Sequence, residues 1–182
     1  SILWGNQGVR GAQVYNLNGA LAINYSLVQG GNGGLGGNSG ADAFHTGAGN
    51  IDADPLLADA GAGNFYLLPG SPAIDAGFDS DAPATDLRGL PRPRVLHADL
   101  GAYEAQGFTL AITGGNNQLA DVGSSLAQPL LVEIDSAGNE PTGPGGMVIF
   151  TPPASGPGLT ATAPISAATD SNGAAGLAVS AN

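Results

Sequence analysis

Short apolar runs separated by glycine-rich turns set the main limit on what this chain can fold into. The sequence contains 31 glycines and 13 prolines, yet 42% of its residues are hydrophobic. Glycine interrupts nearly every window that is long enough for the apolar period of an α-helix. Disorder is the alternative for such a composition, but apolar runs such as residues 21–23 and 130–132 recur between the turns. This pairing is typical of many-stranded β proteins, and we predict an all-β fold.

In the first hundred residues, short predicted strands joined by irregular loops suit a solenoid better than a wide sandwich. Residues 1–6 and 25–31 are separated by about one coil length, judged against known repeats of roughly 20 to 30 residues. Residues 30–40 (GGNGGLGGNSG) have almost no side chains to bury, and we predict a loop or linker there. The predicted strands are residues 2–4, 13–17, 20–28, 50–57, 65–68 and 100–103.

The pattern changes near residues 105–107. Residues 108–113 alternate as a half-buried strand does, and turn-forming runs follow at residues 135–139 and 170–173. The other predicted strands of this half are residues 128–134, 147–150, 160–165 and 174–180. Strands at this spacing favour a β-sandwich. We therefore predict two domains, residues 1–105 and residues 106–182.

Four ordered segments between residues 50 and 104 carry a resemblance to a known family. They are NIDADPLL (50–57), FYLLPGSPAIDAG (65–77), TDLRGLPR (85–92) and DLGAYE (99–104), preceded by SILWGN (1–6) and YSLVQGG (25–31). The first domain resembles the C-terminal part of bacterial right-handed parallel β-helix surface proteins that carry a choice-of-anchor domain. The resemblance implies the terminal rungs and cap of such a helix and display outside a bacterial cell. It supplies no catalytic residues.

A second set of segments occurs after residue 107. They are LADVG (119–123), PLLVEID (129–135), GN (138–139), VIF (148–150) and TDSNGA (169–174). In these segments the second domain resembles the bacterial Ig-like repeats of invasin- and intimin-type adhesins. The resemblance implies a partial Ig-like β-sandwich, incomplete at its C-terminus, because five predicted strands stand against about seven in an Ig domain. We expect an open sheet edge or a hydrophobic groove there.

The charges exclude several classes of partner. The chain has 15 acidic residues against four arginines, with no lysine, for a net charge of −11. Nucleic acid is excluded because no basic surface can displace counterions from phosphates, and the same charge opposes adsorption to anionic lipid. No apolar stretch approaches the roughly 20 residues of a membrane span, so we expect no membrane insertion. Any export or anchoring signals are expected outside this chain.

The absence of cysteine excludes disulfides and thiol chemistry. It also fits an extracellular or bacterial cell-surface location, which the acidic composition favours.

The aspartates of residues 75–86 include a candidate calcium site. Asp75, Asp79 and Asp81 would offer hard oxygen ligands in a glycine-rich loop, as calcium needs. Their spacing lacks the pattern of an EF-hand, and aspartate is also a common turn former. We prefer the turn interpretation and predict no cofactor apart from this calcium alternative.

Three of the four arginines lie within seven residues. Arg88, Arg92 and Arg94 stand between Asp86 on one side and Asp99 and Glu104 on the other. A patch that binds carboxylates or sugars is one interpretation. We prefer structural ion pairs, which would fix the last loop onto the end coil, because the partners are near in sequence.

The remaining candidates do not assemble into a catalytic site, and we predict that the chain is not an enzyme. His45 and His97 lack neighbouring ligands at zinc spacing, and no G-x-S-x-G motif is present. A carbohydrate-active β-helix fragment remains an alternative on fold analogy alone. The aromatic residues could stack on sugars or fill the core, which we prefer; they are Trp4, Tyr15, Tyr25, Phe65, Tyr66 and Tyr103.

These observations predict a structural segment of a bacterial surface protein. We expect open β edges at both ends of the chain, which would recruit strands from other copies head-to-tail and could form a homo-oligomer or a filament. An adhesin module that binds a glycan or a host protein is the alternative.

Overall fold

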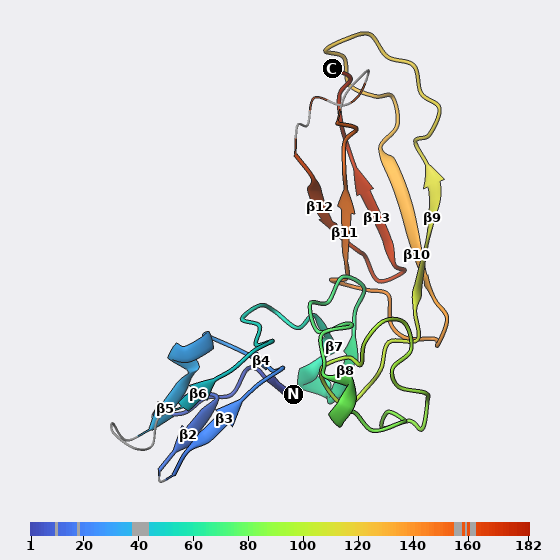
Figure 1. The fold of residues 1–182 in the computed structure, drawn as a ribbon. Helices are drawn as coiled ribbons and strands as arrows, with labels where there is room; N and C mark the ends of the chain where they lie inside the picture. Colours follow the sequence, from blue (N-terminus) through green and yellow to red (C-terminus); the bar gives the residue numbers. More distant parts are fainter. Residues whose placement is uncertain (10, 18, 38–43, 155–157, 159, 161–162) are drawn as a thin grey trace. The chain divides into compact units, whose positions relative to one another are not determined.

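The computed structural model describes residues 1–9, 11–17, 19–37, 44–154, 158, 160 and 163–182. These residues form strands and short 3₁₀ helices, and no α-helix is present among them. The prediction of an all-β chain is therefore confirmed. The chain divides into an N-terminal unit (Ser1–Leu67 and Ser71–Gln106) and a C-terminal unit (Leu68–Gly70 and Gly107–Asn182). Figure 1 draws the first in blue to green and the second mostly in yellow to red.

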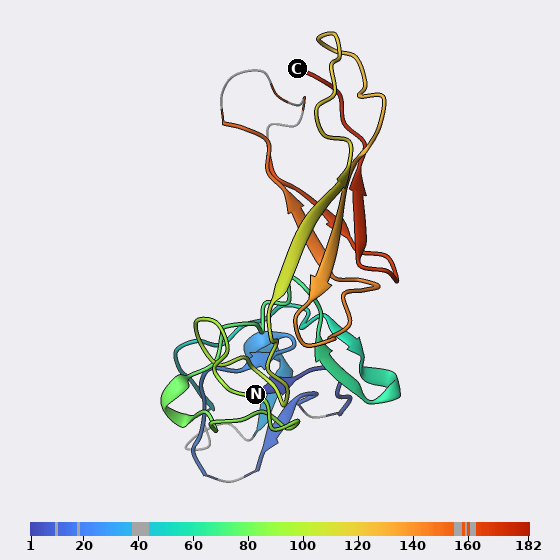
Figure 2. The same ribbon diagram turned by 90° about the vertical axis from the view of Figure 1, so that its right-hand side faces the viewer.

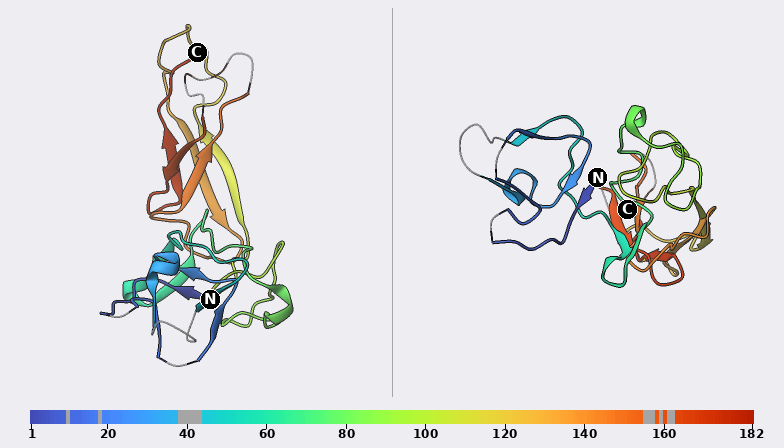
Figure 3. Two further views of the ribbon diagram at one scale, coloured as in Figure 1. Left: turned by 60° about the vertical axis from the view of Figure 1, so that its left-hand side comes forward. Right: turned by 90° about the horizontal axis from the view of Figure 1, so that it is seen from below.

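Three parallel strand pairs build the first part of the N-terminal unit (Figures 1 and 3). They are β1 (Ile2–Leu3) with β4 (Leu27–Val28), β2 (Val14–Asn16) with β5 (Leu35–Gly37), and β3 (Leu21–Ile23) with β6 (Phe44–Thr46). The offsets are 25, 21 and 23 residues, from the partners Ile2 and Leu27, Val14 and Leu35, and Leu21 and Phe44. Ile51 extends the first ladder by a parallel bridge to Leu27. Successive turns of the chain thus stack strand upon strand.

Three predicted strands differ from the structure because the backbone turns within or beside them. Tyr25, at φ 43°, separates β3 from β4 inside the predicted strand 20–28. Leu56, at φ 48°, separates the bridge at Ile51 from β7, so only Ile51 and Leu57 of the predicted strand 50–57 are paired. Residues 100–103 form no strand, and Gly101 takes φ 109° among them. A left-handed backbone conformation is rare at Tyr and Leu, so the sequence pattern could not predict these turns.

The predicted loop at residues 30–40 is wrong over its first part. Gly31–Gly34 form the 3₁₀ helix η1, and Leu35–Gly37 form β5 beside β2; residues 38–40 lie outside the described part. Glycine suits this place because the backbones approach closely: a Cβ on Gly11 would lie 2.5 Å from the backbone nitrogen of Gly36. Backbone hydrogen bonds to β2 are therefore sufficient to form β5, although two of its three residues are glycines.

The rest of the N-terminal unit is a hairpin followed by irregular loops. β7 (Leu57–Asp59) and β8 (Asn64–Leu67) pair antiparallel around the 3₁₀ helix η2 (Ala60–Ala62), and η3 covers Asp79–Asp81. The core joins the coils to these loops, since its buried residues are Leu27, Leu67, Ala73 and Leu100.

Two antiparallel sheets form the C-terminal unit. The first has the order β13 (Ala174–Leu177), β10 (Leu130–Ser136), β9 (Phe108–Gly114), and the second pairs β11 (Met147–Phe150) with β12 (Ile165–Ala168). Their side chains meet in a core of Val132, Ile134, Val148 and Ala175. The strand predicted at residues 160–165 begins instead at Ile165; residues 161 and 162 lie outside the described part.

β9 is the edge strand of the three-stranded sheet, drawn in yellow beside β10 in Figures 1 and 2. Leu110 lies opposite Ile134 and Ile112 opposite Val132, so these paired side chains share the core-facing side of the sheet. Val132 and Ile134 are 6% and 5% exposed, whereas Leu110 and Ile112 are 56% and 66% exposed. The core-facing side of β9 is therefore left uncovered.

Candidate functional site: an arginine–carboxylate cluster and an aromatic pocket

Glu104 is the centre of the charged cluster that the sequence indicated. It is 1% exposed, and its Oε2 accepts hydrogen bonds from Arg92 Nε at 2.8 Å and from the backbone N–H of Asp99 at 2.9 Å. Its Oε1 accepts the backbone N–H of Arg94 at 2.9 Å. Arg92 also donates to the carbonyl oxygens of Asp99 and Gly101, at 2.6 and 2.9 Å. One buried carboxylate thus fixes the loop that carries Arg92 and Arg94.

Asp86 and Arg88 form a second pair in the same cluster. Their side chains approach to 2.7 Å, while Asp86 Oδ1 accepts the backbone N–H groups of Arg88 and Leu90 at 2.8 and 3.0 Å. Burial alone would raise the pKa of Asp86, but hydrogen bonds from the backbone N–H of Glu104 and from the Arg88 guanidinium hold it below its usual range. This carboxylate therefore stays ionised at neutral pH.

Arg88 also contacts aromatic rings that the sequence did not connect with it. The rings of Tyr66 and Tyr103 stack with centroids 4.6 Å apart and an interplanar angle of 4°. The guanidinium carbon of Arg88 lies 5.0 Å from the Tyr66 centroid and 5.5 Å from that of Tyr103, within cation–π range. Arg88 is 22 residues from Tyr66 and 15 residues from Tyr103 in the sequence. No strand or helix periodicity relates residues that far apart, so the sequence could not predict these contacts.

Asp99 differs from the predicted ion pairs because its carboxylate accepts backbone N–H groups. Asp75 donates at 2.7 Å and Ala105 at 2.6 Å, while Arg92 reaches the backbone carbonyl of Asp99 rather than its side chain. Burial raises the pKa of Asp99 to about 6. The sequence does not show which backbone N–H groups a carboxylate binds. The prediction therefore relied on the arginines nearest to Asp99 in sequence.

The raised pKa of Asp99 predicts a pH-dependent stability. The pKa of Asp99 in the folded protein lies above its value in the unfolded chain. Its contribution to the free energy of unfolding is therefore full below about pH 4 and is lost as pH rises through 6, and the loss is about 3 kcal/mol at most. We expect the free energy of unfolding of the N-terminal unit, measured in urea, to be larger at pH 4.5 than at pH 6.5. In Asp99→Asn this difference should shrink; an unchanged difference would assign it to another group.

Of the calcium candidates, Asp75 lies in a turn and Asp79 in the 3₁₀ helix η3, and both side chains accept hydrogen bonds from the chain. Asp75 Oδ1 accepts the backbone N–H groups of Leu96 and His97, both at 3.0 Å. Asp79 Oδ1 accepts that of Ala98 at 2.8 Å, and Asp79 Oδ2 lies 2.8 Å from His97 Nδ1. That hydrogen bond raises the pKa of His97 and lowers the pKa of Asp79. Asp81 is exposed. Within the described ranges no three acidic, His or Cys side chains converge on a common metal position.

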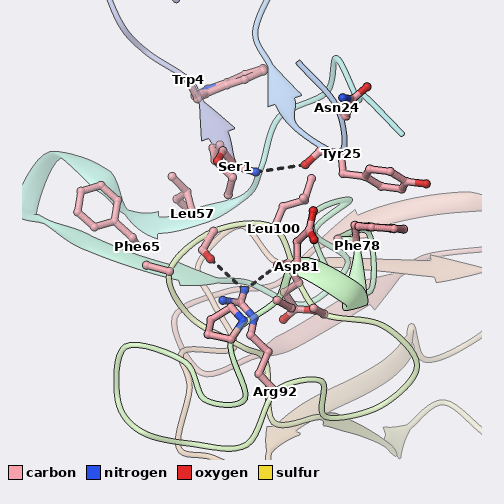
Figure 4. Close-up of a pocket in the computed structure, with 18 of the residues that line it drawn as sticks. Ser1, Trp4, Asn24, Tyr25, Leu57, Phe65, Phe78, Asp81, Arg92 and Leu100 are labelled. Atoms are coloured by element: carbon pink, nitrogen blue, oxygen red, sulfur yellow. Dashed lines mark hydrogen bonds between the residues drawn. The ribbon is translucent and has the colours of Figure 1, made fainter. Parts of the chain in front are cut away.

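A pocket of about 880 Å³ lies in the N-terminal unit beside the cluster (Figure 4). Its walls include the aromatic rings of Trp4, Tyr25, Phe65 and Phe78. Phe65 and Phe78 are 49% and 44% exposed, and Phe78 stacks on Tyr25 with ring centroids 4.8 Å apart. Arg92 also lines this pocket, where its two hydrogen bonds to backbone carbonyls appear as dashed lines in Figure 4.

The pocket combines ring faces with polar groups, including Asn24 and Asp81. Such a wall can hold a ligand that has one apolar face and several hydroxyl groups. The sequence named Trp4, Tyr25 and Phe65 as aromatic candidates but could not place them around one pocket, and it overlooked Phe78.

Comparisons of the chain with protein family models, curated protein sequences and solved structures gave no match. None of the helices in the described part has the length and apolar character that a membrane crossing needs.

Proposed function

We propose that this chain is a structural segment of an extracellular bacterial surface protein that associates with copies of itself through open β edges. In this proposal the N-terminal unit is the end of a right-handed parallel β-helix. The parallel ladders with offsets of 25, 21 and 23 residues support it, since stacked coils of similar length are the basis of such a solenoid. The C-terminal unit would be a partial Ig-like sandwich, for which its two antiparallel sheets offer support.

The observation that carries the self-association is the uncovered edge strand β9. It exposes Leu110 and Ile112 on the core-facing side of its sheet. Long apolar edge strands without charge recruit further strands, and many proteins protect such an edge with lysine or proline. The sequence of β9, FTLAITG, contains neither residue.

Light scattering over a range of protein concentrations tests this function directly. We expect the average mass to rise above that of one chain, and negative-stain electron microscopy to separate closed oligomers from filaments. Ile112→Lys should weaken the association about tenfold or more, because a charge would stand on the edge. Ile149→Lys is the matched control, since Ile149 lies on β11 and is 65% exposed. A wild-type protein that stays monomeric at high concentration would contradict the proposal.

An adhesin function is the second candidate, and the pocket with four aromatic rings favours it. In an acidic chain the fitting ligand would be a neutral glycan, whose sugar rings stack on aromatic faces. Glycan-array binding that Trp4→Ala removes, with oligomer size unchanged, would favour this function over self-association.

A further inference from the structure

We infer that β9 pairs antiparallel with β9 of a second copy about a two-fold axis at Leu110. This inference rests on the proposed self-association and adds the strand, the register and the symmetry. Three properties of β9 carry it: the direction of its peptide groups, the uncovered apolar side chains, and the absence of charged residues within the strand itself.

The register of β9 against β10 defines which peptide groups are free. The backbone N–H of Ala137 donates to the carbonyl oxygen of Gly107 at 2.9 Å. Because hydrogen-bonded and non-bonded pairs alternate in an antiparallel ladder, Thr109 and Ala111 also bond to β10. The N–H and C=O groups of Phe108, Leu110 and Ile112 consequently point to the outer edge of the sheet.

One register of a second β9 uses all three of these residues. Leu110 then stands opposite Leu110 of the second copy, and Phe108 stands opposite its Ile112. Each of these pairs forms two hydrogen bonds, as edge-facing residues do in an antiparallel ladder. Shifting the copies by one pairing step removes one such pair, so we choose the register centred on Leu110.

The same register brings the exposed apolar side chains of the two copies together. Leu110 and Ile112, 56% and 66% exposed, project from one face of β9. In the pair, the side chains of both copies lie next to each other across the new ladder. A single strand added from each copy therefore satisfies the free peptide groups and shields the flanks of the exposed apolar side chains.

Charge explains why this edge suits a second copy. The chain carries a net charge of −11, yet residues 105–120 contain no charged side chain. The nearest carboxylates on the sheet are Glu133 and Asp135 of β10. In a sheet ordered β10-β9-β9-β10, the two copies of β10 would be about 14 Å apart, beyond the screening length of about 8 Å at physiological salt. Association should consequently strengthen as salt is raised from low concentration.

The pair is a small contact between two seven-residue strands. Two paired strands bury less surface area than the interface of a permanent dimer does, so we expect the association to be reversible. A two-fold contact also closes on itself, so the pair by itself gives a dimer, and a filament would need a second contact.

Cysteine cross-linking tests the register, because the chain has no cysteine of its own. Thr109 and Ala111 are exposed, and in the proposed register Thr109 of one copy stands opposite Ala111 of the other at a non-hydrogen-bonded position, about 4.5 Å between Cα atoms. Oxidising a mixture of Thr109→Cys and Ala111→Cys proteins should give several-fold more cross-linked dimer than either variant alone. Ser166→Cys, on the exposed side of β12, is the control for pairing at another edge.

Each outcome decides between specific alternatives. Efficient cross-linking of Ala111→Cys by itself would overturn the register, and cross-linking of Ser166→Cys without the mixed pair would move the contact to β12. If wild-type protein associates in light scattering but the mixture does not cross-link, the β9 pairing is wrong while the proposed function stands. If the wild type does not associate, the proposed function fails, and the pairing fails with it.

Discussion

Replacing Glu104 by alanine should lower the free energy of unfolding of the N-terminal unit by about 3 to 5 kcal/mol. Glu104 is 1% exposed and forms an ion pair with Arg92, whose side chain is 7% exposed. Removing the carboxylate would leave the guanidinium buried without its counterion. It would also leave the backbone N–H groups of Arg94 and Asp99 without their acceptor. Leaving a buried charge uncompensated costs much more than the net contribution of an intact pair.

Urea denaturation followed by intrinsic fluorescence can measure this loss in one unit. The only tryptophan, Trp4, and all four tyrosines precede residue 106, so the signal reports the N-terminal unit. Asp81→Ala is the control, because this carboxylate is exposed in the same unit and its removal should change the free energy by no more than about 0.5 kcal/mol. Equal effects of the two substitutions would show that Glu104 does not hold the loop.

Leu27→Ala should cost the same unit about 2 to 5 kcal/mol. Leu27 is 0% exposed and lies in the middle of a ladder, between its partners Ile2 and Ile51. A smaller side chain there would leave a cavity between stacked turns of the chain, and the surrounding ladders restrict how far the site can collapse.

The same fluorescence experiment applies, with Leu96→Ala as the control. Leu96 is 72% exposed, so its truncation should be nearly neutral. A small effect of Leu27→Ala would mean that the stacked turns do not form the core of the N-terminal unit in solution.

The pairing of arginines with carboxylates was predictable for two of the three carboxylates. Asp86 and Arg88 are two residues apart, and Glu104 follows Arg92 by twelve, so opposite charges near in sequence identified them. The Asp99 carboxylate is held by the backbone N–H groups of Asp75 and Ala105, which the sequence did not indicate. Every residue except proline carries a backbone N–H donor. The residue types in the sequence therefore cannot show which of these donors a carboxylate will bind.

Alternation and turn residues in the sequence determined that the chain is all-β and where most strands of the C-terminal unit lie, since these properties act over a few neighbouring residues. Tertiary structure alone decided what depends on contacts distant in sequence. It formed β5 within a glycine run, because the backbone of β2 supplied a partner. It gathered Trp4, Tyr25, Phe65 and Phe78 around one pocket. It also left Leu110 and Ile112 uncovered while burying Ile134 and Val132 opposite them. The strand pattern of β9 is the same whether or not a second sheet lies above it, so only the packed structure could show that this edge is open.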